Sequence, residues 1–162
     1  MKRTLLVILC ACFVSQLAFA GVVAKINIPG SSLWEYFVGG YDSGDSISIE
    51  SAGSWSHGLA EWCGPEGLPP RTGFNHIIDD APAYALLGKF GQNGTPFVIG
   101  SSWSGTAPSN EPLYFAMNDF AGAFEDNAGS VDMTLETSSV PEPTSLVLLG
   151  LGGLFFRRKP RE

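Results

Sequence analysis

Cysteine is scarce in this sequence, which excludes a disulfide framework. The 162 residues contain three cysteines, Cys10, Cys12 and Cys63. The first two lie in an N-terminal apolar stretch with the features of a cleaved leader, so only Cys63 belongs to the rest of the chain. A single cysteine cannot form an internal disulfide, and stability must come from the apolar core and from any bound metal.

Basic residues are almost missing from the middle of the chain. Six of the nine Lys and Arg residues lie at the two ends, and they are Lys2, Arg3, Arg157, Arg158, Lys159 and Arg161. Residues 21–140 then hold three basic against 14 acidic residues, a net charge near −11. Phosphate binding needs clustered Lys and Arg, so nucleic acid is excluded as a partner. Abundant carboxylates suit a divalent cation, although solubility outside the cell also explains them.

Helical periodicity is also missing outside the two ends. Short apolar or alternating runs occur instead, separated by turns rich in Gly, Asn and Asp, and Val131, Met133 and Leu135 alternate onto one face. The runs are 22–28, 33–38, 47–49, 84–90, 96–99, 113–117 and 131–135. This pattern predicts an all-β protein, an antiparallel jelly-roll-like β-sandwich whose loops carry the site.

The N-terminus has the order of a secretory signal. Lys2 and Arg3 precede an apolar stretch that ends in Ala18-Phe19-Ala20, a small-x-small pattern. We expect residues 1–20 to form a signal helix read by the Sec machinery and cut before Gly21. A buried helix is the weaker alternative.

The C-terminus has an equally ordered pattern. Pro141-Glu142-Pro143 precedes an apolar run of about a dozen residues and the basic residues Arg157, Arg158 and Lys159. The apolar run is shorter than the roughly 20 residues of a comfortable membrane span. Residues 140–162 resemble the PEP-CTERM sorting signal, which implies a short hydrophobic helix, transient anchoring in the inner membrane and processing by an exosortase-type protease. A plain membrane anchor is the alternative, and both interpretations export residues 21–139 to the cell surface or beyond.

A stretch rich in oxygen ligands runs from Asn118 to Gly129, between two predicted strands. Asp119, Asp126 and Asn127 offer short side-chain oxygens, and Gly122 and Gly129 allow main-chain carbonyls to turn inward. Calcium takes about six to eight oxygen ligands, so this loop is a candidate calcium site. An ordinary hairpin turn uses the same residue types and is the alternative.

Three blocks of sequence resemble the calcium-dependent galactophilic lectins of the Pseudomonas type, small jelly-roll domains. The blocks are 43–67, 85–96 and 118–130, and the last keeps the spacing of the family's calcium loop. The resemblance implies calcium as cofactor and a galactose-binding-like sandwich. It also implies a ligand set, made of side-chain oxygens from Asp119, Asp126 and Asn127 and carbonyl oxygens from His57 and Ala123. Asp126 stands where the family has Asn, and His57 replaces an aromatic residue.

The sugar half of the site departs from the family. A His and a Gln that touch galactose there have no counterpart in residues 68–72, where Arg71 and Thr72 could donate hydrogen bonds instead. With His57 and Asp119 they are the candidate sugar-binding residues. Trp62 and Trp103 could stack on a sugar ring, although we favour the core for both.

Three classes of function remain. The first is an exported, calcium-dependent carbohydrate-binding protein that recognises a galactoside or an exopolysaccharide. The second is a structural protein of the cell surface or matrix, in which calcium only stabilises the fold. The third, an enzyme, would need Cys63 beside His57, or a pair among Glu61, Glu66, Asp79 and Asp80, and we expect none of these to act. We favour the first, and a homo-oligomer is compatible with it.

Overall fold

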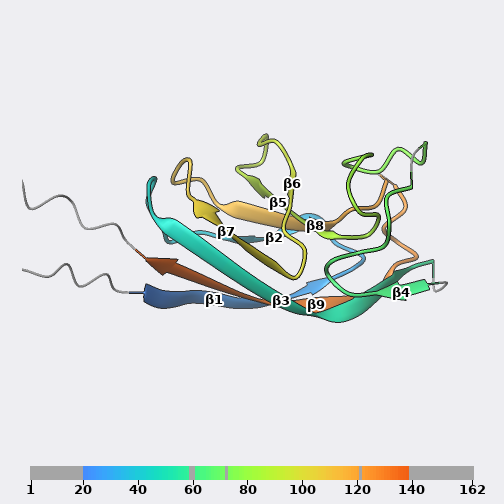
Figure 1. The fold of residues 1–162 in the computed structure, drawn as a ribbon, viewed down its shortest axis with the longest axis horizontal. Coiled ribbons are helices and arrows are strands. Elements are labelled where there is room, and N and C mark those ends of the chain that lie inside the picture. The colour runs from blue at the N-terminus through green and yellow to red at the C-terminus, as the bar shows by residue number, and fades with distance from the viewer. Residues whose placement is uncertain (1–19, 59–60, 72, 121, 139–162) are drawn as a thin grey trace, which may run out of the picture. The chain divides into compact units, whose positions relative to one another are not determined.

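Two antiparallel β-sheets make up the described part of the chain, residues 20–58, 61–71, 73–120 and 122–138 of a computed structural model. One sheet has the order β1-β9-β3-β4, with β7 also pairing with β3, and the other has the order β2-β8-β5-β6. The two sheets lie one over the other (Figure 1). The strands are β1 (Ala20–Pro29), β2 (Leu33–Val38), β3 (Ser46–His57), β4 (Glu61–Cys63), β5 (Leu86–Phe90), β6 (Phe97–Val98), β7 (Ser102–Thr106), β8 (Leu113–Met117) and β9 (Ala128–Ser138).

The predicted all-β sandwich is confirmed, with differences in the strands. β2 and β8 match the predicted runs, whereas β3 and β9 extend well beyond them. The sequence predicts neither β4 nor β7. β7 reads Ser-Trp-Ser-Gly-Thr, which lacks a repeating apolar residue, and β4 has only three residues, so neither shows a period-two signal.

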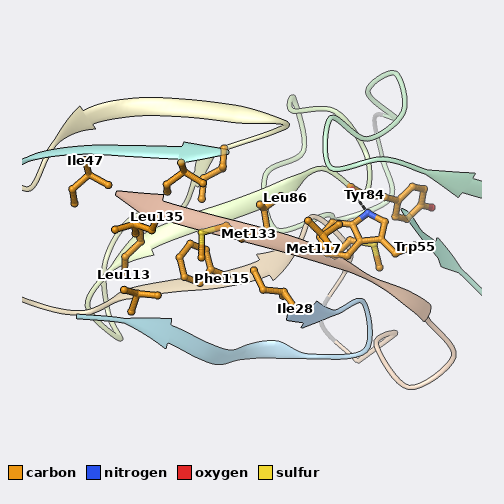
Figure 2. Close-up of a cluster of buried hydrophobic side chains, with 14 of the residues drawn as sticks. Ile28, Ile47, Trp55, Tyr84, Leu86, Leu113, Phe115, Met117, Met133 and Leu135 are labelled. Atoms are coloured by element: carbon orange, nitrogen blue, oxygen red, sulfur yellow. Dashed lines mark hydrogen bonds between the residues drawn. The ribbon is translucent and has the colours of Figure 1, made fainter. Parts of the chain in front are cut away.

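The core lies between the two sheets. Val131, Met133 and Leu135 of β9 are at most 1% exposed, which confirms the predicted inward face of this strand. Ile47 and Ile49 of β3 lie buried beside them. The second sheet contributes a matching set, Leu86, Leu113, Phe115 and Met117 (Figure 2). Each such side chain stabilises the fold by about 1.5–3 kcal/mol through its burial.

The long strands separate two ends of the sandwich. β3 and β9 pair from Ser46 opposite Ser138 to Ser56 opposite Ala128, and Ala20 of β1 also lies opposite Ser138. The first and last described residues are therefore neighbours at one end, while β4 and the loops after it lie at the other (Figure 1). Ten residues of strand place these ends about 34 Å apart.

Neither predicted terminal helix can be compared with the structure. The signal helix at 1–20, apart from Ala20 itself, and the hydrophobic helix at 140–162 lie outside the described residues. Within the described ranges, no helix is long and apolar enough to cross a membrane.

Candidate functional site

The acidic loop from Asn118 to Asn127 joins β8 to β9, and so it passes from one sheet to the other. A hairpin joins neighbouring strands of one sheet, so the hairpin interpretation is wrong. The loop is fixed at its start by Asn118, which is fully buried. Its amide oxygen accepts the N–H of Ile78, and its amide nitrogen donates to the carbonyls of Ile78 and Pro82.

Asp119 and Asn127, from the two ends of this loop, meet inside the protein. They are 1% and 8% exposed, and the Asn127 Nδ2 donates to the Asp119 Oδ2 at 3.0 Å. The other carboxylate oxygen, Oδ1, accepts the N–H of Phe120 at 2.8 Å. Within the described ranges, Asp119 forms no salt bridge with a Lys, Arg or His side chain. The ion pair in those ranges joins Arg71 to Glu61. A buried carboxylate without a cation is costly to maintain.

The amide oxygen of Asn127 is left bare. The Asn127 Nδ2 donates both to Asp119 and to the carbonyl of Gly30, the latter at 3.1 Å. Both partners can only accept a hydrogen bond, so the amide atom that faces them must be the nitrogen. Oδ1 is then the buried atom without a hydrogen-bond partner. Buried polar atoms in native structures are nearly always paired, so Oδ1 is available to a further donor or to a cation.

The other predicted metal ligands lie around this pair. Asp126 is exposed, and its Oδ2 lies 3.1 Å from where a Cβ on Gly58 would be, next to His57. His57 and Ala123 are half-buried. No group of three or more His, Cys, Asp or Glu side chains in the described ranges is arranged to hold a metal. A metal here would therefore need amide and main-chain oxygens besides the carboxylates.

The chain's two histidines both contact Tyr84, which sequence reasoning assigned only to a strand. The His57 ring stacks on the Tyr84 ring with centroids 4.0 Å apart and planes 7° apart, and the His76 ring meets it edge-on at 5.5 Å. The Nε2 atoms of both histidines are buried without a partner, as is the Ser56 hydroxyl. Only the rarity of histidine in the sequence could have drawn attention to this cluster.

Arg71 extends the cluster towards solvent. Its guanidinium carbon lies 5.5 Å from the centroid of the Tyr84 ring, and its Nη2 donates to Glu61 Oε2 at 2.6 Å. Burial raises the pKa of the Tyr84 hydroxyl, the positive charge of Arg71 lowers it, and the negative charge of Asp119 raises it again. The charges of Arg71 and Asp119 thus both reach the Tyr84 hydroxyl. Thr72, the other predicted donor, lies outside the described residues.

The two tryptophans have different environments. Trp103 packs against the core, with its ring 5.0 Å from Phe97, as predicted. Trp62 is 55% exposed, so its predicted burial in the core is wrong. Trp62 and its neighbour Glu61 in β4 are both exposed.

The candidate catalytic groups do not assemble in the described residues. Cys63 lies opposite Trp55, whereas His57 lies opposite Glu61, and no hydrogen bond joins Cys63 to His57. Burial, with the nearby charge of Glu66, raises the pKa of the Cys63 thiol to about 11. Glu61 pairs with Arg71, and Glu66, Asp79 and Asp80 are exposed.

The oxygen atoms of this loop are of the kind that calcium binds. Asp119 is a buried carboxylate without a cation, and Asn127 Oδ1 is a buried acceptor without a donor. Both are hard oxygen ligands, the kind that calcium prefers, and the exposed Asp126 carboxylate lies in the same loop. A bound cation would therefore neutralise the buried charge of Asp119 and give Asn127 Oδ1 a partner.

The two sheets form a lectin-like β-sandwich. Among solved structures, the N-terminal domain of EclA, described as a PllA-like lectin, is similar over 72% of this chain and 97% of that domain, with a TM-score of 0.56 and 17% sequence identity. At this identity the similarity concerns the fold, and it confirms the predicted sandwich class.

The C-terminal prediction is confirmed by a family model. The PEP-CTERM protein-sorting motif matches residues 139–159, which include Pro141, Glu142, Pro143, Arg157, Arg158 and Lys159. These residues lie outside the described ranges. The chain is an exported protein with a lectin-like fold, and its sorting motif implies processing by an exosortase.

Proposed function

We propose that this protein is an exported, calcium-dependent carbohydrate-binding protein that acts at the cell surface or in the extracellular polysaccharide after sorting. The paired Asp119 and Asn127 carry the calcium half of this proposal, because a buried, cation-free carboxylate lies beside a bare amide oxygen. The lectin-like fold of the EclA domain supports the carbohydrate half.

The residues of the loop have distinct tasks in this function. Asp119 and Asn127 would hold the ion from inside the protein, and Asp126 would add a second negative charge from the surface. Carbonyl oxygens of His57 and Ala123 would complete the set. Bound there, calcium would supply positive charge and coordination positions for sugar hydroxyls.

The sugar side would be formed by Arg71 and the stacked pair of His57 and Tyr84. Arg71 has five N–H donors, of which one nitrogen is engaged by Glu61, so others can face a hydroxyl or carboxylate of the sugar. The surface ion pair with Glu61 is weak, worth up to about 1 kcal/mol, and does not prevent this. Stacking on Tyr84 would hold the His57 ring in place beside the bound sugar.

Glycan binding with and without calcium tests the function. The protein is applied to an array of galactosides and bacterial polysaccharides in calcium and again in a chelator, and we expect binding in calcium alone. Arg71→Ala should weaken glycan binding by roughly 1–3 kcal/mol, the contribution of a charged hydrogen bond, and leave calcium affinity unchanged. Lys25→Ala, which removes an exposed cation from β1, is its control and should change neither.

Asp126→Ala tests the metal half with a control from the same loop. It should lower calcium affinity, whereas Glu125→Ala removes an equal charge from the neighbouring exposed position and should lower it much less. Calcium uptake without binding to any glycan would favour a structural protein stabilised by calcium and would refute the carbohydrate-binding proposal.

A further inference from the structure

Trp62 is a large apolar side chain held at the surface. It is 55% exposed, and it lies opposite Ser56 in the pairing of β4 with β3. Its ring packs on the main chain at Gly129, since a Cβ added there would lie 2.7 Å from Trp62 Cζ3. Contact with the backbone keeps the indole against the sheet, while more than half of the residue stays open to solvent.

Polar side chains continue the same surface across three strands. Side chains alternate along a strand, so Trp62, Ser56 and, two residues away, Ser54 share the outer face of the sheet. Ser54 lies opposite Ser130 of β9. From β1, the Asn27 Nδ2 donates to Ser130 Oγ at 2.9 Å and to Asp132 Oδ1 at 2.8 Å.

Ser56 shares this face of the sheet with Trp62 but is covered rather than exposed. Ser56 is fully buried, directly opposite Trp62, and its Oγ has no hydrogen-bond partner. The polar side chains that a ligand on this face can reach are therefore those of Ser54, Ser130 and Asn27.

An indole beside hydroxyl, amide and carboxylate groups matches the chemistry of a sugar unit. A pyranose has an apolar C–H face that packs on an aromatic ring and a rim of hydroxyls that need donors and acceptors. The surface also adjoins the calcium loop. Gly129, under the indole, comes two residues after Asn127, and His57 is paired with Glu61, the residue before Trp62.

We propose that Trp62, with Ser54, Ser130 and Asn27, forms a second sugar subsite on the outer face of the first sheet. It binds a further unit of the glycan whose first unit is held at the calcium loop, so the protein recognises a chain of sugars. This inference rests on the proposed carbohydrate-binding function.

Calorimetry in calcium compares the full chain with methyl β-galactoside and with β-linked galactan oligomers of two to four units. The wild-type protein should bind the oligomers more tightly than the monosaccharide by about 3- to 10-fold, the size of one aromatic contact. Trp62→Ala should abolish this gain and leave monosaccharide affinity unchanged, and Trp62→Phe should keep part of it. Phe37→Ala is the matched control, because Phe37 is also 55% exposed but lies on β2 of the other sheet, and the gain should survive it.

The outcomes separate this inference from the function on which it rests. Equal affinity of the wild-type protein for monosaccharide and oligomers would refute the second subsite and leave the lectin function intact. Binding of neither in calcium, together with no binding to any glycan of the array, would overturn both. Sedimentation of the wild-type protein and of Trp62→Ala adds a further check. If the wild-type protein is a dimer and Trp62→Ala is a monomer, a second copy of the chain covers the indole, and the subsite proposal is wrong.

Discussion

Tyr84 shows how a single residue organises this site. Its φ of 63° lies in the left-handed region, which costs an L-residue with a side chain roughly 1–2 kcal/mol. The conformation is held from both sides, because its N–H donates to the Asn118 carbonyl and its own carbonyl accepts the Trp55 indole N–H. In this backbone conformation the Tyr84 ring contacts the rings of His57 and His76 and the guanidinium of Arg71. A helix or strand position could not present it this way.

Residue-level reasoning found the polar half of the site and missed the aromatic half. Asp119 and Asn127 could be predicted because their spacing resembles that of the lectin family's calcium loop, and the structure brings the two side chains together. Tyr84 and His76 could not, because the left-handed turn at Tyr84 and the contacts of both rings depend on segments far apart in sequence. Trp62 was misassigned because an exposed tryptophan is indistinguishable from a buried one by residue type.

Cys63 should be chemically quiet, although it is a free thiol. Burial, and after it the charge of Glu66, raises its pKa from an ordinary 9.0 to about 11, so at pH 7.5 almost no reactive thiolate is present. Alkylation by iodoacetamide, followed by intact mass, should be much slower in the native protein than in urea, and its rate should keep rising past pH 10. Fast native alkylation that levels off below pH 9 would contradict this environment.

The same pKa has a consequence for stability. The unfolded thiol ionises at its ordinary pKa, while the folded thiol stays protonated until about pH 11. Between these values the unfolded state binds fewer protons than the folded state, so stability decreases as pH rises from about 9 to 11. Below pH 9 this group contributes nothing to the pH dependence.

At the scale of elements, the site depends on strand ends. β8 and β9 were predicted as flanks of the loop, but alternation alone could not show that they belong to different sheets. That separation makes the loop cross the sandwich, and it places Asp119 and Asn127 inside the protein. β4 was missed because three residues carry no periodicity, yet it supplies the hairpin that brings His57, Glu61 and Trp62 to the same end.

Gly129 sets the geometry where the loop enters β9, and its replacement tests this. Its φ is 82°, and an added Cβ would collide with the Ser54 carbonyl and the Trp62 ring. Gly129→Ala should therefore lower the free energy of unfolding by about 1–3 kcal/mol, measured in urea. Gly44→Ala is the control, because Gly44 has a φ of 97° with open space around it, so it should show only the conformational strain. Equal losses would mean that the Trp62 ring is not fixed on Gly129.

At the scale of the whole molecule, the first and last described residues and the candidate site lie at opposite ends of the sandwich. Ala20 and Ser138 lie opposite each other at one end of β1 and β9, and the sorting motif at 139–159 follows directly in sequence. The candidate site lies at the other end of β9, about 34 Å away by strand rise. The described chain therefore begins and ends away from the loop that carries Asp119 and Asn127.

Calcium should stabilise the whole domain, because the charge that it neutralises belongs to a buried part of the fold. Residues 21–140 carry a net charge near −11, and Asp119 is 1% exposed without a cation in its described surroundings. Ion binding to the folded state raises stability by mass action, by about 2.7 kcal/mol at a hundredfold excess over the dissociation constant. Thermal unfolding in increasing calcium should therefore show a melting temperature that keeps rising with concentration.

Magnesium at equal concentration should have little effect, since it requires a tight octahedron that a loop of amide, carbonyl and carboxylate oxygens does not match. The rise should shrink in Asp126→Ala, and a melting temperature that calcium leaves unchanged in the wild-type protein would refute the metal site.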